Sequence, residues 1–322
     1  MPQIIVPDKN GSTDGTAHNF LQMLDVSMPI LLLTAFPEMQ LGDSINYLKG
    51  KKYALICYAE YGWDWVRNKT HIWGKNTDEF YPKFQTDDYK RLDDFIKENP
   101  PAVVFKRELL KGDSKDNIYP IEFPNWQSEY PVSSKEEFNS RPISVFNYWG
   151  RSHEARLLFH ADIWRNAAIN GASVCDNVFY FNNFMAEERN PNKWVTFNIP
   201  HYSRIDIREL LKINGLSKLS VSLPGAGIKC FRTTGESPVN SAMVMPEDNL
   251  AYTYEFVDQE SCIKFKADDP KGVDIKWDII DTINKTLVNE NLYDIYLEGV
   301  QIANKYRIEN YKKHIENIIN KI

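Results

Sequence analysis

The chain has 322 residues, of which 43% are hydrophobic and 25% are charged, and its formal net charge is -6. This composition is typical of a globular protein with a large core; it excludes a disordered chain, and the acidic balance gives no overall attraction to nucleic acid. At this length we expect two domains.

Cysteine usage and the amino-terminal sequence bear on the cellular compartment. The 4 cysteines are scattered without a C-x-x-C pair, which favours reduced thiols over disulfides or structural zinc. The first residues lack the basic and apolar regions of a secretory signal. The apolar run at 28–33 is too short to span a bilayer. We therefore expect a cytoplasmic protein without a membrane span.

The first half of the chain alternates apolar runs with segments of helical spacing. The runs predict buried strands at 3–6, 29–36, 53–58 and 102–106, and the spacing predicts helices at 18–24 and 87–98. This alternation is typical of βαβ units with a mainly parallel sheet, and it places an α/β domain within residues 1–135. Such sheets bind ligands beyond the carboxyl ends of their strands.

Chemically active side chains follow three of these predicted strands, and those at the end of the fourth strand are Lys106, Arg107 and Glu108. Those after the first strand are Asp8 and, beyond a glycine-rich loop, His18. Those after the third strand are Glu60, Trp63, Asp64 and Trp65. Carboxylates among aromatic rings suit a sugar, because the rings stack on it while the carboxylates bond its hydroxyls. An aromatic-rich loop that covers one edge of the core explains the pattern equally well.

A change of composition separates the two halves of the chain. Residues 111–140 are rich in Pro, Ser, Asp and Asn without a sustained period, which predicts a linker. A second domain within 136–285 then opens with a strand at 143–147. Gly150 and Arg151 follow at a helix start, a turn that favours anions, although a solvated helix face explains it as well. The charged residues 286–322 predict helices that brace the domains.

The most informative segment is residues 218–240, in which a short apolar strand runs into a glycine turn and then into cations. Its chemistry-bearing residues are Gly225, Gly227, Lys229, Arg232 and Glu236. Glycines let the backbone approach a phosphate, the cations neutralise its charge, and the carboxylate can accept hydrogen bonds from ribose hydroxyls. The same residues also fit an ordinary glycine turn.

Residues 143–322 resemble the carboxy-terminal domain of exostosin-like glycosyltransferases of the GT-B type. The resemblance rests on the strand–Gly150–Arg151–helix turn, on SLPGAGIKCFRTTGESPVNSAMVMPED and on the terminal LYDIYLEGVQIANKYRIENYKKHI. It implies two Rossmann-like domains facing across a cleft, with a nucleotide-sugar donor in the second and an acceptor in the first. It places Gly225, Gly227, Lys229 and Arg232 at the diphosphate, Glu236 at the ribose or donor sugar, and Arg151 at the leaving nucleotide.

The expected function is therefore transfer of a hexosyl or pentosyl group from a nucleotide sugar to an acceptor hydroxyl of a glycan or another molecule. Because the chain contains no D-x-D triplet, the expected reaction needs no metal and no cofactor, and we expect inversion at the sugar. The base is one of Asp64, Glu60, Asp8 and His18, with Asp64 favoured; Trp63, Trp65 and His18 are expected to bind the acceptor.

Two alternatives to this function remain open. The first is a carbohydrate- or nucleotide-binding protein of the same fold without activity. The second is a glycosyltransferase that acts on modified DNA bases, which would need a local basic groove. A dehydrogenase or an epimerase is disfavoured, because the first strand is followed by GSTDG and not by G-x-G-x-x-G.

Overall fold

The computed structural model divides the chain into two compact units, and it describes most of the residues. The described residues are 2–6, 15–33, 42–58, 87–126, 132–147, 173–175, 195–198, 211–212, 214–222, 229, 233–234, 240–266 and 273–322. The first unit comprises residues 1–124, 249–255 and 306–322, and the second comprises 125–248 and 256–305. Within the described ranges, no helix is long and apolar enough to cross a membrane.

The first unit is built on a parallel sheet whose strands follow each other in chain order. Its described strands are β1 (Ile4–Ile5), β2 (Ile30–Leu33), β3 (Ala54–Cys57), β4 (Val103–Lys106) and β5 (Ile118–Pro120). The sequence predicted the first four of them. Every residue of β2, β3 and β4 is buried, as expected of parallel strands that are covered on both faces.

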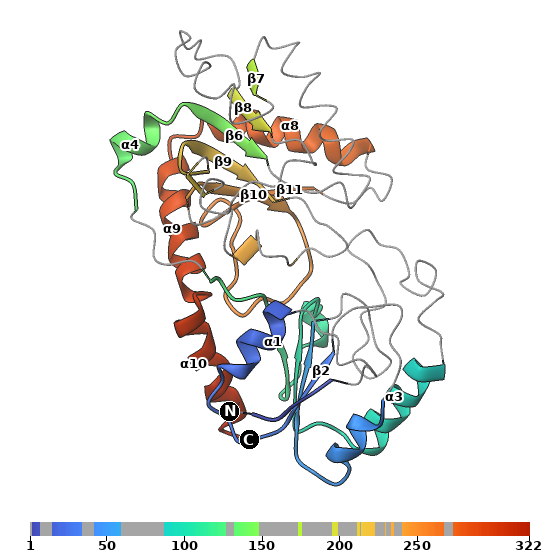
Figure 1. The fold of residues 1–322 in the computed structure, drawn as a ribbon. Coiled ribbons are helices and arrows are strands. Elements are labelled where there is room, and N and C mark those ends of the chain that lie inside the picture. Colours follow the sequence, from blue (N-terminus) through green and yellow to red (C-terminus); the bar gives the residue numbers. More distant parts are fainter. Residues whose placement is uncertain are drawn as a thin grey trace. The chain divides into compact units, whose positions relative to one another are not determined.

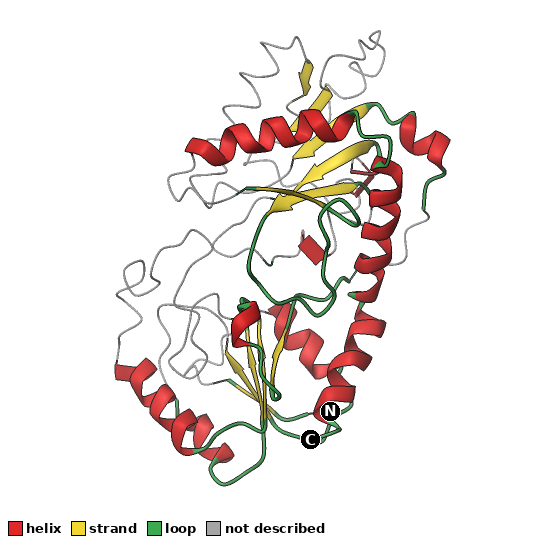
Figure 2. Ribbon diagram, turned by 180° about the vertical axis from the view of Figure 1, so that it is seen from behind, coloured by secondary structure: helices red, strands yellow, loops and turns green. Residues whose placement is uncertain are grey.

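Helices flank this sheet, and all of the described ones except the shortest bury apolar side chains. They are α1 (Gly15–Gln22), the 3-10 helices η1 (Asp43–Leu48) and η3 (Lys111–Asp113), α3 (Asp87–Glu98) and α10 (Ile308–Ile319). Helix α3 has the predicted bounds and buries Leu92, Phe95 and Ile96 in the core beside β3. Helices α1 and α10 lie side by side (Figures 1 and 2), where Phe20 stacks on Tyr311 with ring centroids 5.8 Å apart.

The prediction of a linker at 111–140 is wrong for much of that segment. Strand β5 adds to the first sheet through its pairing with β4, and α4 (Lys135–Asn139) is a helix of the second unit. A capping box starts α4, in which the Ser134 side chain accepts from the Glu137 amide and the Glu137 side chain accepts from the Ser134 amide. Both elements are too short to produce a visible hydrophobic period.

The second unit contains another parallel sheet, with a crossover at its centre. Its described strands are β6 (Ile143–Asn147), β7 (Ser173–Cys175), β8 (Val195–Asn198), β9 (Ser217–Val221), β10 (Ala242–Pro246) and β11 (Ile263–Phe265), in the spatial order β11-β10-β9-β6-β8-β7. The chain builds β7 and β8 on one side of β6 and then β9, β10 and β11 on the other. The carboxyl ends of β6 and β9 therefore flank a topological switch point, where open α/β sheets bind ligands.

Two long helices pack on this second sheet (Figure 1). Helix α8 (Val273–Leu287) contacts β11, and α9 (Leu292–Lys305) contacts β10. Helix α9 approaches the segment before β11 closely at Gly299, where a Cβ atom would lie 2.8 Å from the backbone oxygen of Ser261. Only glycine fits at that position without a shift of the helix.

Candidate functional site

Most of the residues that the sequence singles out lie outside the described part of the chain. They are Asp8, Glu60, Trp63, Asp64, Trp65, Gly150, Arg151, Gly225, Gly227, Arg232 and Glu236. Lys229 and His18 are described. The site is therefore built from these two residues and from the strand ends that border the other segments.

A buried polar group lies beyond the carboxyl end of β9. The backbone amide of Ser222 donates to the Val244 oxygen at 2.7 Å, which continues the sheet one residue past the strand. The Ser222 hydroxyl lies 3.3 Å from the Thr233 hydroxyl, which folds residues 233–234 back onto the strand end. Lys229, Thr233 and Thr234 are each 1% exposed. Two hydroxyls are thus in contact at the edge that ligands use in such sheets, and a buried lysine lies in the segment of chain between them.

This group has the chemistry of an anion site. An ammonium supplies charge and three donors, and hydroxyls add donors that can turn toward a phosphoryl oxygen. The sequence predicts Lys229 at an anion site, which stays a prediction, and it did not single out Ser222, Thr233 or Thr234. The signal that could have found them is the pair of consecutive threonines that follows the glycine turn and its cations.

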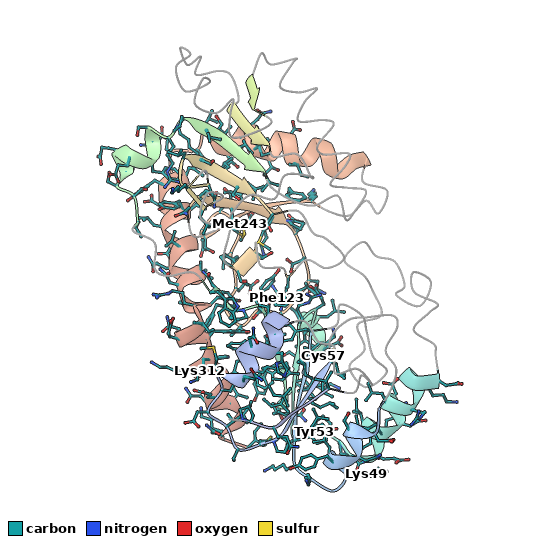
Figure 3. The ribbon with its side chains drawn as sticks, in the orientation of Figure 1. Lys49, Tyr53, Cys57, Phe123, Met243 and Lys312 are labelled. Carbon is teal, nitrogen blue, oxygen red and sulfur yellow. The ribbon has the colours of Figure 1, made fainter. Side chains whose placement is uncertain are left out.

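Charged residues also gather at the carboxyl edge of the first sheet. Lys106 ends β4 and is fully buried, and the next two residues, Arg107 and Glu108, are 6% and 3% exposed. Arg107 Nε lies 3.8 Å from Glu108 Oε1. Figure 3 shows Cys57 and Phe123 at this edge, while Tyr53 and Lys49 lie toward the opposite end of the unit.

A second buried carboxylate at this edge, Glu122, has a structural role. Its Oε2 atom accepts a hydrogen bond from the Tyr311 hydroxyl at 2.9 Å, and its Oε1 atom accepts one from the Thr253 amide at 3.3 Å. Burial, followed by the charge of Glu122, raises the pKa of Tyr311 and of Tyr306 well above the ordinary value, so both hydroxyls stay protonated. Glu122 thus anchors residues 249–255 and α10 to β5.

The aromatic cluster beside Glu122 predicts an acid-sensitive first unit. His314 stacks on Tyr311 and packs against Tyr254, and burial lowers the pKa of His314, against an opposing effect of Glu122 and with a smaller lowering by Lys321. Because the unfolded chain then binds a proton more readily than the folded one, stability should fall as the pH drops below the ordinary histidine value of about 6.5. His314→Gln should flatten this slope in urea unfolding between pH 5 and 8; an unchanged slope would contradict the assignment.

The remaining described candidate is His18, which is half-buried in the first turn of α1. Residues 7–14, which contain Asp8, lie outside the described residues, so the predicted role of Asp8 stays a prediction. Among the described residues, no group of three or more His, Cys, Asp or Glu side chains is arranged to hold a metal ion.

Comparisons with known proteins identify the fold. No family model and no curated protein matches the sequence. Similar solved structures include TarM (TM-score 0.50, 11% identity), a GtfA/B complex (0.49, 13%) and the pneumococcal O-GlcNAc transferase GtfA in complex with UDP and GlcNAc (0.49, 12%). Each similarity covers 95% of this chain, and the chain spans 57% of TarM and 59% of each of the other two.

The likeness to TarM, a glycosyltransferase of GT-B type, confirms the expected fold class. The chain is an α/β protein with two Rossmann-like units of that type. The resemblance to exostosin-like enzymes in particular stays a prediction.

Proposed function

We propose that this chain is a glycosyltransferase that moves a sugar from a nucleotide-sugar donor to an acceptor hydroxyl. The observation that carries the proposal is the contact of the Ser222 and Thr233 hydroxyls beyond the carboxyl end of β9, with Lys229 buried in the segment of chain between them. It lies in the half of the chain whose sequence resembles a donor domain. The fold shared with glycosyltransferases supports the same function by analogy.

In the proposed reaction, the acceptor oxygen attacks the anomeric carbon while the bond from that carbon to the diphosphate breaks. Negative charge grows on the diphosphate as the sugar passes through an oxocarbenium-like state. Lys229 and Arg232 meet that charge in the second unit, together with the turn at Gly225 and Gly227 and with Arg151 after Gly150. Glu236 is proposed to bond the ribose or the donor sugar.

The acceptor is proposed to bind to the first unit, through Trp63, Trp65 and His18. A carboxylate of that unit removes the hydroxyl proton while the acceptor oxygen attacks from the face opposite the diphosphate, and this single displacement inverts the anomeric carbon. Among the loop residues, Asp64 is the first candidate, with Glu60 and Asp8 as the others. A non-catalytic carbohydrate- or nucleotide-binding protein is the alternative that the experiment below separates.

The test of the donor site is a thermal-shift screen with UDP, GDP, CMP, ADP and their common sugar conjugates. A nucleotide at about 100 times its dissociation constant should stabilise the wild type by roughly 2.7 kcal/mol. Lys229→Met keeps the length of the side chain but removes its charge, so we expect affinity to fall at least about tenfold, or roughly 1.4 kcal/mol. Thr233→Val should weaken binding less, because it removes one hydroxyl.

Controls separate this result from a loss of folding. Lys97→Met, on the exposed face of α3, should leave the nucleotide shift unchanged. Since the reaction is proposed to need no metal, EDTA should change neither the shift nor turnover of the sugar conjugate. No shift with any nucleotide would overturn the proposed function, and binding without turnover would favour the non-catalytic alternative.

A further inference from the structure

A group of exposed lysines lies at the amino edge of the first sheet, at the other end of the strands from the edge where parallel sheets hold their ligands. This basic edge consists of Lys49, Lys51, Lys52 and Lys321. The Lys52 ammonium donates to the Ile322 oxygen, which brings the end of the α10 segment to the turn at 49–52. Figure 3 shows Lys49 at the end of the unit away from Cys57 and Phe123.

The turn at 49–52 is held in place by its neighbours. Gly50 has a φ of 69°, which glycine adopts without strain, and its amide lies 3.5 Å from Asn99 Oδ1 at the end of α3. The Tyr53 hydroxyl donates to the Asn99 oxygen at 2.7 Å. The Lys51 ammonium lies 3.0 Å from the centre of the Tyr47 ring. Three lysines are therefore kept together on one ordered turn.

The charge of the basic edge is not balanced within the described part of the chain. None of its four ammonium groups lies within ion-pair distance of an aspartate or glutamate side chain of a described residue. The exposed carboxylates nearby, Asp25 and Glu98, are fewer, and Glu316 is occupied by the Asp25 amide and by Lys312. Because neighbouring like charges repel, an anionic partner is favoured here, although the whole chain is acidic.

Apolar side chains are exposed at the same edge. Among the described residues of the first unit, the large apolar side chains that are exposed are Met23, Tyr47 and Ile322, at 45%, 41% and 39%. Met23 lies in the connection from α1 to the amino end of β2, Tyr47 contacts Lys51, and Ile322 contacts Lys52. Lysines that surround exposed apolar side chains suit the interface of a lipid bilayer, since the apolar groups have no role in binding a polyanion in water.

We infer that the basic edge docks the first unit on an anionic lipid surface. The lysines meet the lipid phosphates, while Met23, Tyr47 and Ile322 enter the headgroup layer. Because this surface lies at the amino ends of the strands, docking leaves the carboxyl edge of the sheet free for ligands. The inference goes beyond the proposed function and does not depend on it.

The experiment is cosedimentation of the full chain with phosphatidylcholine vesicles that contain or lack phosphatidylglycerol. We expect binding to the anionic vesicles alone, and less of it when salt rises from about 0.1 M to about 1 M, because the Debye length falls from about 10 Å to about 3 Å. One lysine near an anionic surface contributes about fivefold in affinity, so the double variant Lys49→Gln, Lys51→Gln should bind about 25-fold more weakly. Met23→Ser should also weaken binding, by removing apolar contact.

A matched control separates this surface from net charge. The double variant Lys90→Gln, Lys285→Gln loses the same charge at exposed positions on the first turn of α3 and on α8, so it should bind within about twofold of the wild type. Equal melting temperatures would show that the variants are folded. Absence of binding to anionic vesicles, equal losses in the two double variants, or binding to heparin without binding to vesicles would each overturn the inference. Since no nucleotide is used, these outcomes leave the proposed function untouched.

Discussion

Arg141→Ala is expected to destabilise the second unit by roughly 3 to 5 kcal/mol, since each buried carbonyl that loses its donor costs about 1 to 3 kcal/mol. Arg141 precedes β6, and its Nη1 atom donates to the Ser217 oxygen at 2.8 Å and to the Asn240 oxygen. Its Nη2 atom donates to the Ser133 hydroxyl at 2.9 Å. One guanidinium thus joins the amino ends of β6, β9 and β10.

Aromatic packing and a permanent charge at Arg141 determine the size and the pH dependence of the expected loss. Its guanidinium carbon lies 4.6 Å from the ring centre of Phe138 and 4.9 Å from that of Tyr296, so alanine also loses packing. Burial lowers the pKa of Arg141, against opposing effects of Tyr296 and Glu137, but an arginine stays charged at neutral pH. The loss should therefore be equal at pH 6 and pH 8 in urea unfolding.

Two further variants test whether the stability depends on the geometry of the guanidinium donors of Arg141. Arg141→Lys keeps the charge but cannot reach three acceptors in different directions, so it should recover less than half of the loss. Lys285→Ala, at an exposed position of α8, should stay within about 0.5 kcal/mol of the wild type. An Arg141→Ala protein as stable as this control would show that the network does not hold the sheet together.

The buried strands were predictable because both faces of a parallel sheet are covered. The apolar run at 29–36 therefore contains β2, and 53–58 contains β3. Strand β5 was not predictable, because three half-buried residues carry no period. Nor does the sequence show that residues 249–255 join the first unit, since their contacts are made with β5, with residues 109–111 and with α10.

One candidate site residue, Lys229, has a signal in the local sequence. Lys229 follows a glycine turn after a strand, a local signal that any reading of the sequence can find. The structural role of Glu122 has no local signal in the sequence. Glu122 is a carboxylate near a strand end, and its bonds from Tyr311, 189 residues away along the chain, and from the Thr253 amide give it a structural role.

Tyr311→Phe is the second large expected loss, roughly 2 to 4 kcal/mol in the free energy of unfolding of the first unit, because hydrogen bonds to charged groups contribute about 1.5 to 3 kcal/mol. The Tyr311 hydroxyl accepts from the Glu122 amide at 2.8 Å and donates to Glu122 Oε2 at 2.9 Å. Phenylalanine keeps the ring contacts with Phe20 and Tyr306, so the change isolates the hydroxyl.

The comparison for this loss is Tyr119→Phe, in the same unit. The Tyr119 hydroxyl donates to the Asp116 oxygen at 2.8 Å in an exposed setting, so its removal should cost less than about 0.5 kcal/mol. Hydrogen exchange should show faster opening of residues 249–255 in Tyr311→Phe alone. If the two variants cost the same, Glu122 does not anchor α10.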